Sequence, residues 1–154
     1  VRPLIPGRLM IVFGAGGDRD PGKRPRMGNA ASVADYAIIT SDNPRSESPQ
    51  AIAEAILQGW LGASSPEVIL DRTAAIERAI RLAGPGDGVL IAGKGHEQLQ
   101  IEGSRSRSFC DVAVARDAIQ TVLSDSNLWP SGPHSVKSLT TGLVSPFDSR
   151  EGSA

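Results

Sequence analysis

The stretch at 8–17, RLMIVFGAGG, decides the fold, because an apolar run ends there in glycines. Such a run predicts a buried strand followed by a tight turn. Similar short apolar runs recur at 36–40 (YAIIT), 67–70 (EVIL) and 89–92 (VLIA). Strands that are apolar along their whole length are typical of a parallel sheet covered on both faces.

Amphipathic segments alternate with these strands. Ser48 and Asp71 are each placed to cap a helix, and Leu99 and Ile101 alternate with polar neighbours, as in a half-exposed strand. We expect helices at about 27–33, 49–58, 72–82 and 111–123. In the last of them, the residues expected to face the core are Val114, Ala118, Ile119 and Val122. The alternation predicts an α/β fold, with a mostly parallel sheet and helices on both faces.

The chain divides into two parts of different composition. We expect a single domain over 1–125, because the alternating pattern stops there. The remainder, 126–154, is rich in Ser, Gly and Pro and has no apolar periodicity, so we expect an irregular tail that is disordered or foreign to the domain. The chain begins with Val1 rather than Met, and we expect it to be a segment of a longer protein.

Composition excludes several classes of protein. The 154 residues include 16 Lys and Arg and 17 Asp and Glu, a net charge of −1, which argues against a nucleic-acid partner. The one cysteine, Cys110, cannot form an internal disulfide, and we expect it to be buried. There is no apolar run of membrane-spanning length and no secretory signal, so we expect no membrane partner and a cytoplasmic location. His96 has no partners at metal-ligand spacing, so we expect this chain to form no metal site.

Three polar or glycine-rich loops directly follow predicted strands, at 14–25, 41–49 and 93–97. The carboxyl ends of parallel strands meet at one edge of a sheet, which is where ligands bind. The first loop fits the G-x-x-x-x-G-K spacing of a P-loop at 17–23, but Arg24 stands where Ser or Thr is needed to hold Mg²⁺. We therefore do not expect a P-loop in this chain.

These loops carry charges of both signs, as the recognition of a zwitterion requires. The first loop contains Arg19, Lys23, Arg24 and Arg26, which form either a solvated basic surface or an anion site. In the second loop, Arg45 can grip a carboxylate while Asp42 receives an ammonium group, unless the loop is only an Asx-type turn with Arg45 in solvent. In the third loop, Gly93 allows backbone to approach a ligand and Glu97 adds a second anion.

Four motifs in order resemble the C-terminal domain of the Mur ligases, and among these the members that add meso-diaminopimelate. They are FGAGGDRDPGKRPRMG (13–28), SDNPRSESP (41–49), AGKGHEQLQI (92–101) and FCDVAVARDAI (109–119). The resemblance runs from about residue 7 to 123. It implies a Rossmann-like domain of an ATP-dependent amide-bond ligase of peptidoglycan synthesis, which joins meso-diaminopimelate to UDP-N-acetylmuramoyl-L-alanyl-D-glutamate.

The resemblance also implies roles for individual residues. The substrate-binding residues carried over by motif are Arg19, Asp42, Asn43, Pro44, Arg45, Gly93 and Glu97. No catalytic residue is implied in this chain, and ATP, Mg²⁺ and the UDP-sugar would be bound mainly by other domains of the full-length enzyme. The chain alone would bind no cofactor and show no ligase turnover. Two alternatives remain open at this point: a stand-alone module that binds zwitterions, and an inactive fragment.

Overall fold

The computed structural model describes residues 2–95 and 97–125. Its main sheet consists of β1 (Leu9–Phe13), β2 (Tyr36–Ile39), β3 (Glu67–Val68) and β4 (Gly88–Ile91). The strand order is β3-β2-β1-β4, and every pair is parallel. A separate antiparallel hairpin is formed by β5 (Leu99–Glu102) and β6 (Arg105–Ser108), and a short 3-10 helix, η1 (Arg2–Leu4), opens the chain. The expectations for the tail at 126–154 lie outside the described residues.

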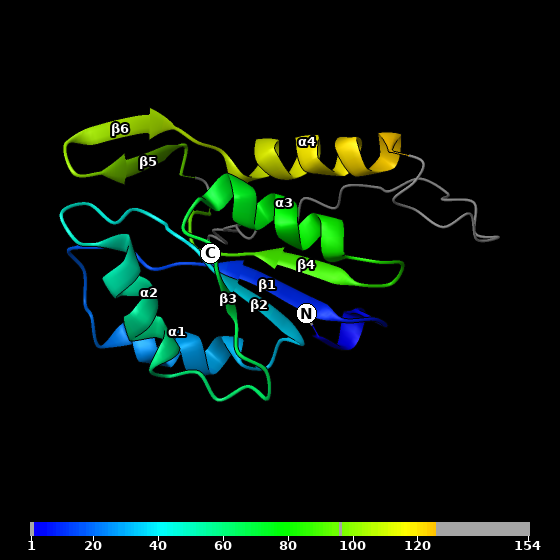
Figure 1. Cartoon of the computed structure of the whole chain (residues 1–154), viewed down its shortest axis with the longest axis horizontal. Helices are drawn as coiled ribbons and strands as arrows, with labels where there is room; N and C mark the ends of the chain where they lie inside the picture. The colour runs from blue at the N-terminus through cyan, green and yellow to red at the C-terminus, as the bar shows by residue number, and fades with distance from the viewer. Residues whose placement is uncertain (1, 96, 126–154) are drawn as a thin grey trace, which may run out of the picture.

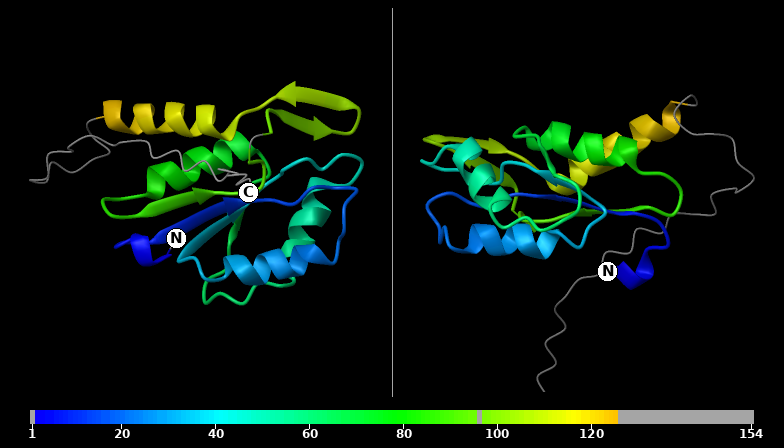
Figure 2. Two further views of the ribbon diagram at one scale, coloured as in Figure 1. Left: turned by 180° about the vertical axis from the view of Figure 1, so that it is seen from behind. Right: turned by 60° about the horizontal axis from the view of Figure 1, so that its bottom comes forward.

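Two apolar cores lie on opposite faces of the sheet, because successive strand residues point to opposite sides. Val12 and Ile38, which are paired in register, pack with α3 (Arg72–Leu82) and α4 (Asp111–Ser124). The next pair, Phe13 and Ile39, packs with α1 (Lys23–Ala31) and α2 (Pro49–Leu57). Figure 1 shows α3 and α4 above the sheet and α1 and α2 below it, and Figure 2 shows the same layers from behind. The predicted α/β class with helices on both faces is confirmed.

The helix caps agree with the sequence, whereas one helix start does not. The side chains of Ser48 and Asp71 accept hydrogen bonds from backbone N–H groups at the starts of α2 and α3, as predicted. However, α1 begins at Lys23 rather than near Met27. Pro25, which we expected to prolong the loop, lies in the first turn of α1, where a missing N–H breaks no helical hydrogen bond.

Three expectations about burial were wrong. Ile119 is 42% exposed, because α4 packs mainly on α3 and leaves that side chain beside the sheet edge. In β5 the alternation is inverted, with Leu99 49% exposed and Gln100 buried, because the Gln100 Oε1 accepts hydrogen bonds from Arg107, its partner on β6. Cys110 is partly exposed, at the N-terminal boundary of α4.

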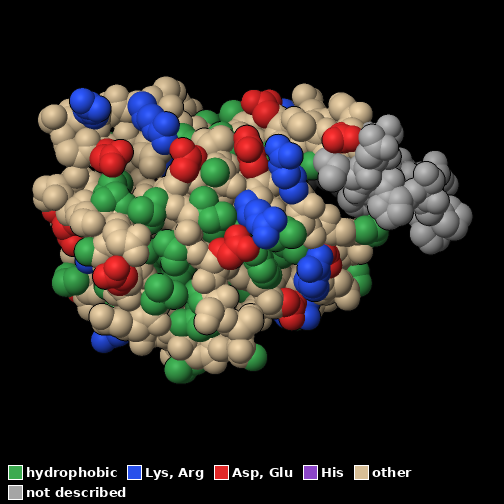
Figure 3. All heavy atoms as spheres, viewed as in Figure 1, with side chains coloured by type: hydrophobic (Ala, Val, Ile, Leu, Met, Phe, Trp, Pro, Cys, Tyr) green, Lys and Arg blue, Asp and Glu red, His purple; other side chains and the backbone are tan. Residues whose placement is uncertain are grey.

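The surface mixes charges of both signs. Figure 3 shows basic and acidic side chains intermixed over one face, without a field of a single sign. Within the described ranges, no helix combines the length and the apolar character that a bilayer crossing requires.

Candidate functional site

The three predicted loops lie together at the carboxyl ends of β1, β2 and β4. Figure 1 shows the arrowheads of β1 and β4 directed to the side on which the β5–β6 hairpin lies. The loops are also bonded to one another, since the Gly17 N–H donates to the Asn43 carbonyl (2.8 Å) and Asn43 Nδ2 donates to Glu97 Oε2 (2.6 Å). The site edge expected from the topology is thus present, and it is built from segments up to 80 positions apart in sequence.

Asn43 is the centre of this edge, and it is buried. Its side-chain Nδ2 donates to Glu97 Oε2 at 2.6 Å. Its Oδ1 accepts from Lys94 Nζ at 3.0 Å and from the Ile101 N–H at 2.9 Å. The side chain is thereby hydrogen-bonded to the third loop and to the hairpin, and it places the carboxylate of Glu97 beside the second loop.

Arg45 is not directed freely into solvent, which excludes the simple surface turn. Its Nη1 donates to the Gly17 carbonyl at 2.6 Å. Its backbone is paired with the hairpin through hydrogen bonds to Ile101 and Gly103. Its φ of +52° lies in the left-handed region, which non-glycine residues rarely adopt. The hairpin and the first loop therefore hold this guanidinium at a fixed place.

Gly16 lies beside the side chains of two arginines. A Cβ at this position would lie 3.0 Å from Arg45 Nη1 and 3.6 Å from Arg19 Cγ. Arg19 itself is exposed and has no ion pair with any described residue. The Arg45 guanidinium and the aliphatic stem of Arg19 thus lie beside one glycine after β1.

Pro44 fixes the path of the second loop. It is fully buried, and its carbonyl accepts the Glu47 N–H at 3.0 Å. A Cβ at Gly17 would come within 1.8 Å of this carbonyl oxygen. Only glycine at that position permits the first and second loops to be this close.

The predicted role of Asp42 as a free ammonium acceptor does not agree with its surroundings. Its Oδ1 lies 3.4 Å from Lys94 Nζ, an ion pair in which both side chains are largely buried. Gly93, which has a φ of +119°, lies against it, because a Cβ there would be 3.5 Å from Asp42 Oδ2. Glu97 is instead the exposed carboxylate of this edge.

Two buried cations of the site were missed in the sequence. Lys94 and Arg72 each have fully buried side chains. Arg72 forms two hydrogen bonds to Asp111, and it also donates to the carbonyls of Ser41 and Ala92. Arg72 therefore joins the start of the second loop to the residue that precedes the third loop. The position of Lys94 between two glycines was the only local signal for its burial.

The basic first loop is only partly solvated. Arg24 is 5% exposed and donates to both carboxylate oxygens of Glu47. These hydrogen bonds, with one from the Asp18 N–H, hold the pKa of Glu47 below its ordinary value. Arg24 is thus held by Glu47, whereas Arg19 is exposed and lies beside Gly16.

The first loop does not have the geometry of a P-loop. In a P-loop the backbone N–H groups point at phosphate, whereas here the N–H groups of Gly17, Asp18 and Gly22 donate to Asn43, Glu47 and Asp20 respectively. Within 2–95 and 97–125, no three His, Cys, Asp or Glu side chains are grouped to hold a metal. No step involving ATP or Mg²⁺ can be derived from these residues.

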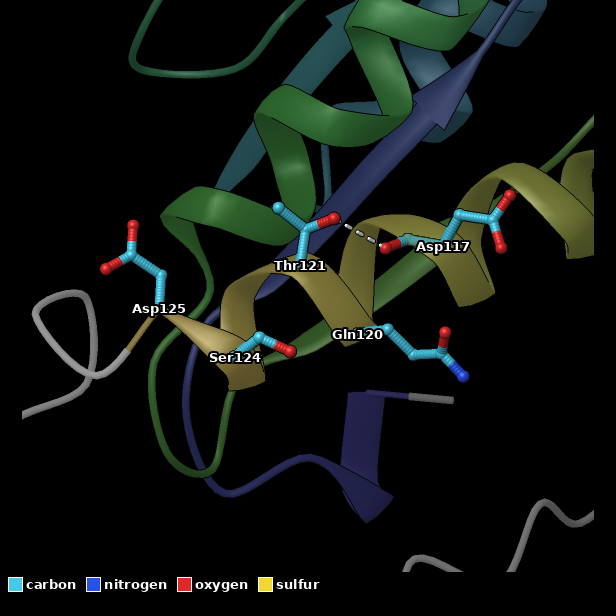
Figure 4. Close-up of a pocket in the computed structure, with 5 residues that line it drawn as sticks. All are labelled: Asp117, Gln120, Thr121, Ser124 and Asp125. Atoms are coloured by element: carbon cyan, nitrogen blue, oxygen red, sulfur yellow. Dashed lines mark hydrogen bonds between the residues drawn. The ribbon is translucent and has the colours of Figure 1, made fainter.

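Two cavities lie away from the three loops. One, of about 670 Å³, is at the C-terminal end of α4 and is lined by Asp117, Gln120, Thr121, Ser124 and Asp125 (Figure 4). The other, of about 320 Å³, lies between α3, α4 and β4 and is mainly apolar. Neither contains a predicted site residue.

Comparisons with known proteins agree with this geometry. The family model described as Mur ligase, glutamate ligase domain, matches residues 1–95. The UDP-N-acetylmuramoyl-L-alanyl-D-glutamate--2,6-diaminopimelate ligase of Synechocystis sp. is 56% identical over 119 residues, which are 77% of this chain and 24% of that enzyme. The enzyme of the same name from Gloeobacter violaceus is 51% identical over 119 residues, again 77% of this chain and 24% of the relative.

A solved structure of a ligase with this name superimposes with a TM-score of 0.72 at 44% identity. The match covers 76% of this chain and 24% of that one. The chain therefore spans about a quarter of the length of the relatives that it matches. The family match extends over more than half of the chain, and it includes the first and second loops and the start of the third. The chain belongs to the Mur ligase family and corresponds to its glutamate ligase domain, at the C-terminal side of these enzymes.

Proposed function

We propose that this domain supplies the amino-acid site of an ATP-dependent ligase that adds meso-diaminopimelate to UDP-N-acetylmuramoyl-L-alanyl-D-glutamate. The observation that carries the proposal is the fixed arrangement of Arg45, Asn43 and Glu97. The Arg45 Nη1 lies 3.4 Å from the Asn43 carbonyl, and the side chain of the same asparagine holds Glu97. A cation and an anion thus flank one residue, as a zwitterionic ligand requires.

The proposed ligand has two carboxylates and two amines, and the site offers a partner for each kind of group. Arg45 uses Nη1 to bind Gly17 and retains Nε and Nη2 for one carboxylate. Arg19 is exposed beside it for another. Glu97 receives an ammonium group, while Pro44 and Gly93 shape the backbone around the ligand. Asp42 contributes indirectly, as the counterion of Lys94.

The chemistry of acyl activation belongs to another part of the longer protein. The first loop uses its N–H groups internally, so we place ATP and Mg²⁺ outside this domain. In the assembled enzyme the domain would deliver the amine and exclude water from the reacting centre. By itself the chain would bind the amino acid without turnover. The UDP-linked partner and the cytoplasmic location are part of the same proposal.

Calorimetry on this chain tests the proposal. We expect meso-diaminopimelate to bind and L-lysine, which lacks the distal carboxylate, to bind about 10–200-fold more weakly, since an unpaired Arg45 costs about 1–3 kcal/mol. Arg45→Ala is expected to remove most of this difference. The matched control is Arg116→Ala, an exposed arginine of α4, which is expected to preserve it. Equal affinity of the unmodified chain for the two amino acids would contradict the proposal.

A further inference from the structure

Lys94 lies at the junction of the second loop, the third loop and the hairpin. Its Nζ donates to Asn43 Oδ1 at 3.0 Å and to the Leu99 carbonyl at 2.7 Å. It lies 3.4 Å from Asp42 Oδ1 and 5.8 Å from the centre of the Phe109 ring. An ammonium group has three N–H donors, and three oxygens surround this one. The side chain is completely buried, so no ligand can contact it without displacing protein atoms.

The contact to Asn43 determines which way its amide points. With Oδ1 toward Lys94 and the Ile101 N–H, the Nδ2 group is directed at Glu97. The reversed amide would place an NH₂ group against an ammonium and an N–H, and an oxygen against a carboxylate. Three attractive contacts would become three repulsive ones. The buried charge of Lys94, together with the Ile101 N–H, therefore favours one of the two amide orientations.

The orientation of Asn43 in turn fixes Glu97. Glu97 is exposed, and its only hydrogen bond from a side chain in the described part of the chain is the 2.6 Å contact from Asn43 Nδ2. We propose that Lys94 is a positioning residue that, through the Asn43 amide, holds the Glu97 carboxylate in place to receive the ammonium group of the amino acid. The inference rests on the proposed function for the identity of this ligand, but the Lys94–Asn43–Glu97 relay exists without ligand.

The relay can be measured on the free chain by NMR of the Asn43 side-chain NH₂ group. Glu97→Gln is expected to shift this signal in the unmodified chain, because the charged acceptor is lost. In a Lys94→Met background Asn43 Oδ1 keeps only the Ile101 N–H of its two donors, so the amide is held less firmly toward Glu97 and the same substitution should shift the signal by less than half as much. A shift of the same size in both backgrounds would overturn the inference. Lys23→Met, which removes an exposed lysine, is the matched control and should leave the full shift.

Removal of Lys94 also leaves Asp42 without its counterion, and the single variant could fail to fold for that reason. The double variant Asp42→Asn, Lys94→Met removes both charges and provides the same NMR comparison. A full Glu97→Gln shift in the double variant would equally overturn the relay, whereas a reduced shift supports it.

Binding provides the second measurement. Lys94→Met is expected to weaken meso-diaminopimelate binding at least tenfold, and Glu97→Gln in that background should add less than it does alone, because the two act through one contact. Independent, fully additive effects would overturn the inference. If the unmodified chain did not bind meso-diaminopimelate but the NMR coupling were present, the proposed function would fail and the relay would stand. If it bound and Lys94→Met bound equally well, only the relay would fail.

Discussion

The two ends of the sheet use ion pairs in opposite ways. At the carboxyl end, the side chains of Arg72 and Lys94 are 0% exposed. At the amino end, Arg8 and Arg2 are 54% and 48% exposed in their pairs with Asp87 and Asp35. Exposed pairs contribute little to stability, whereas a buried charge is costly unless its partners remain in place. At the carboxyl end, therefore, the burial of charged side chains carries a cost in stability, and the same side chains hold polar groups in place.

The bonding pattern shows what is held there. Lys94 connects two loops and the hairpin, and Arg72 connects the second loop, the residue before the third loop and the start of α4. At the amino end, Asp87 instead binds the neighbouring β1 and the turn before β4 through Arg8 and the Gly84 N–H. The hydrogen bonds at the carboxyl end order the segments that bear the proposed site. Those at the amino end join the residue before β1 to the turn before β4.

Arg72→Met is the substitution that we expect to have the largest effect. It leaves Asp111, which is 11% exposed, without its bidentate partner, and removes donors to two buried carbonyls. Loss of one member of a buried pair costs about 3–5 kcal/mol. Urea denaturation should show this decrease in the free energy of unfolding.

Removing both Arg72 and Asp111 separates the cost of an unpaired buried charge from the cost of lost packing. Arg72→Met with Asp111→Leu should be less destabilising than Arg72→Met alone, since no uncompensated charge remains. If the double variant were the less stable of the two, the cost would come from packing and the contrast between the two ends would lose its electrostatic basis.

Most of the fold could be predicted from the sequence, but only part of the site could be. Apolar runs and caps such as Ser48 and Asp71 are local signals, so the strands and most helices follow from them. The three loops were found because strand ends meet at one edge in any parallel sheet. The burial of Arg72 and Lys94 was not predictable in this way, because it depends on Asp111 and Asn43, which are 39 and 51 positions away.

The errors have the same origin. Pro25 was assigned to the loop at 14–25 because its position within the first turn of a helix was unknown. Ile119 fits the apolar periodicity of α4, yet whether a neighbour covers it is decided by tertiary packing, and it is 42% exposed. Asp42 carries the charge expected of a ligand-binding residue, but a buried lysine occupies it.

A smaller effect is expected at the amino end when the pH is lowered. Hydrogen bonds from Arg8 and from the backbone lower the pKa of Asp87 from 3.8 to about 2. A carboxylate with a lowered pKa in the folded state stabilises the protein above the unfolded value, and this contribution is lost as the pH falls from about 4 to about 2. It amounts to at most about 2 kcal/mol, because Arg8 is exposed and the pair is partly screened.

Asp87→Asn tests this contribution. The variant should be less stable than the unmodified chain at pH 7, and the difference should nearly vanish at pH 2, where the native carboxylate is half protonated or more. Denaturation curves at the two pH values measure it. A difference that does not change with pH would assign the role of Asp87 to hydrogen bonding alone.

The smallest effect is expected for the pair between Arg2 and Asp35. Its atoms are 3.3 Å apart, but the two side chains are 48% and 39% exposed. Arg2→Met should therefore change the free energy of unfolding by less than about 1 kcal/mol. The change should disappear in 1 M salt, where the Debye length falls to about 3 Å. The effect of Arg72→Met should persist in the same salt, because solvent ions do not reach a completely buried guanidinium. If both effects persisted or both disappeared, exposure would not be what separates the two ends of this sheet.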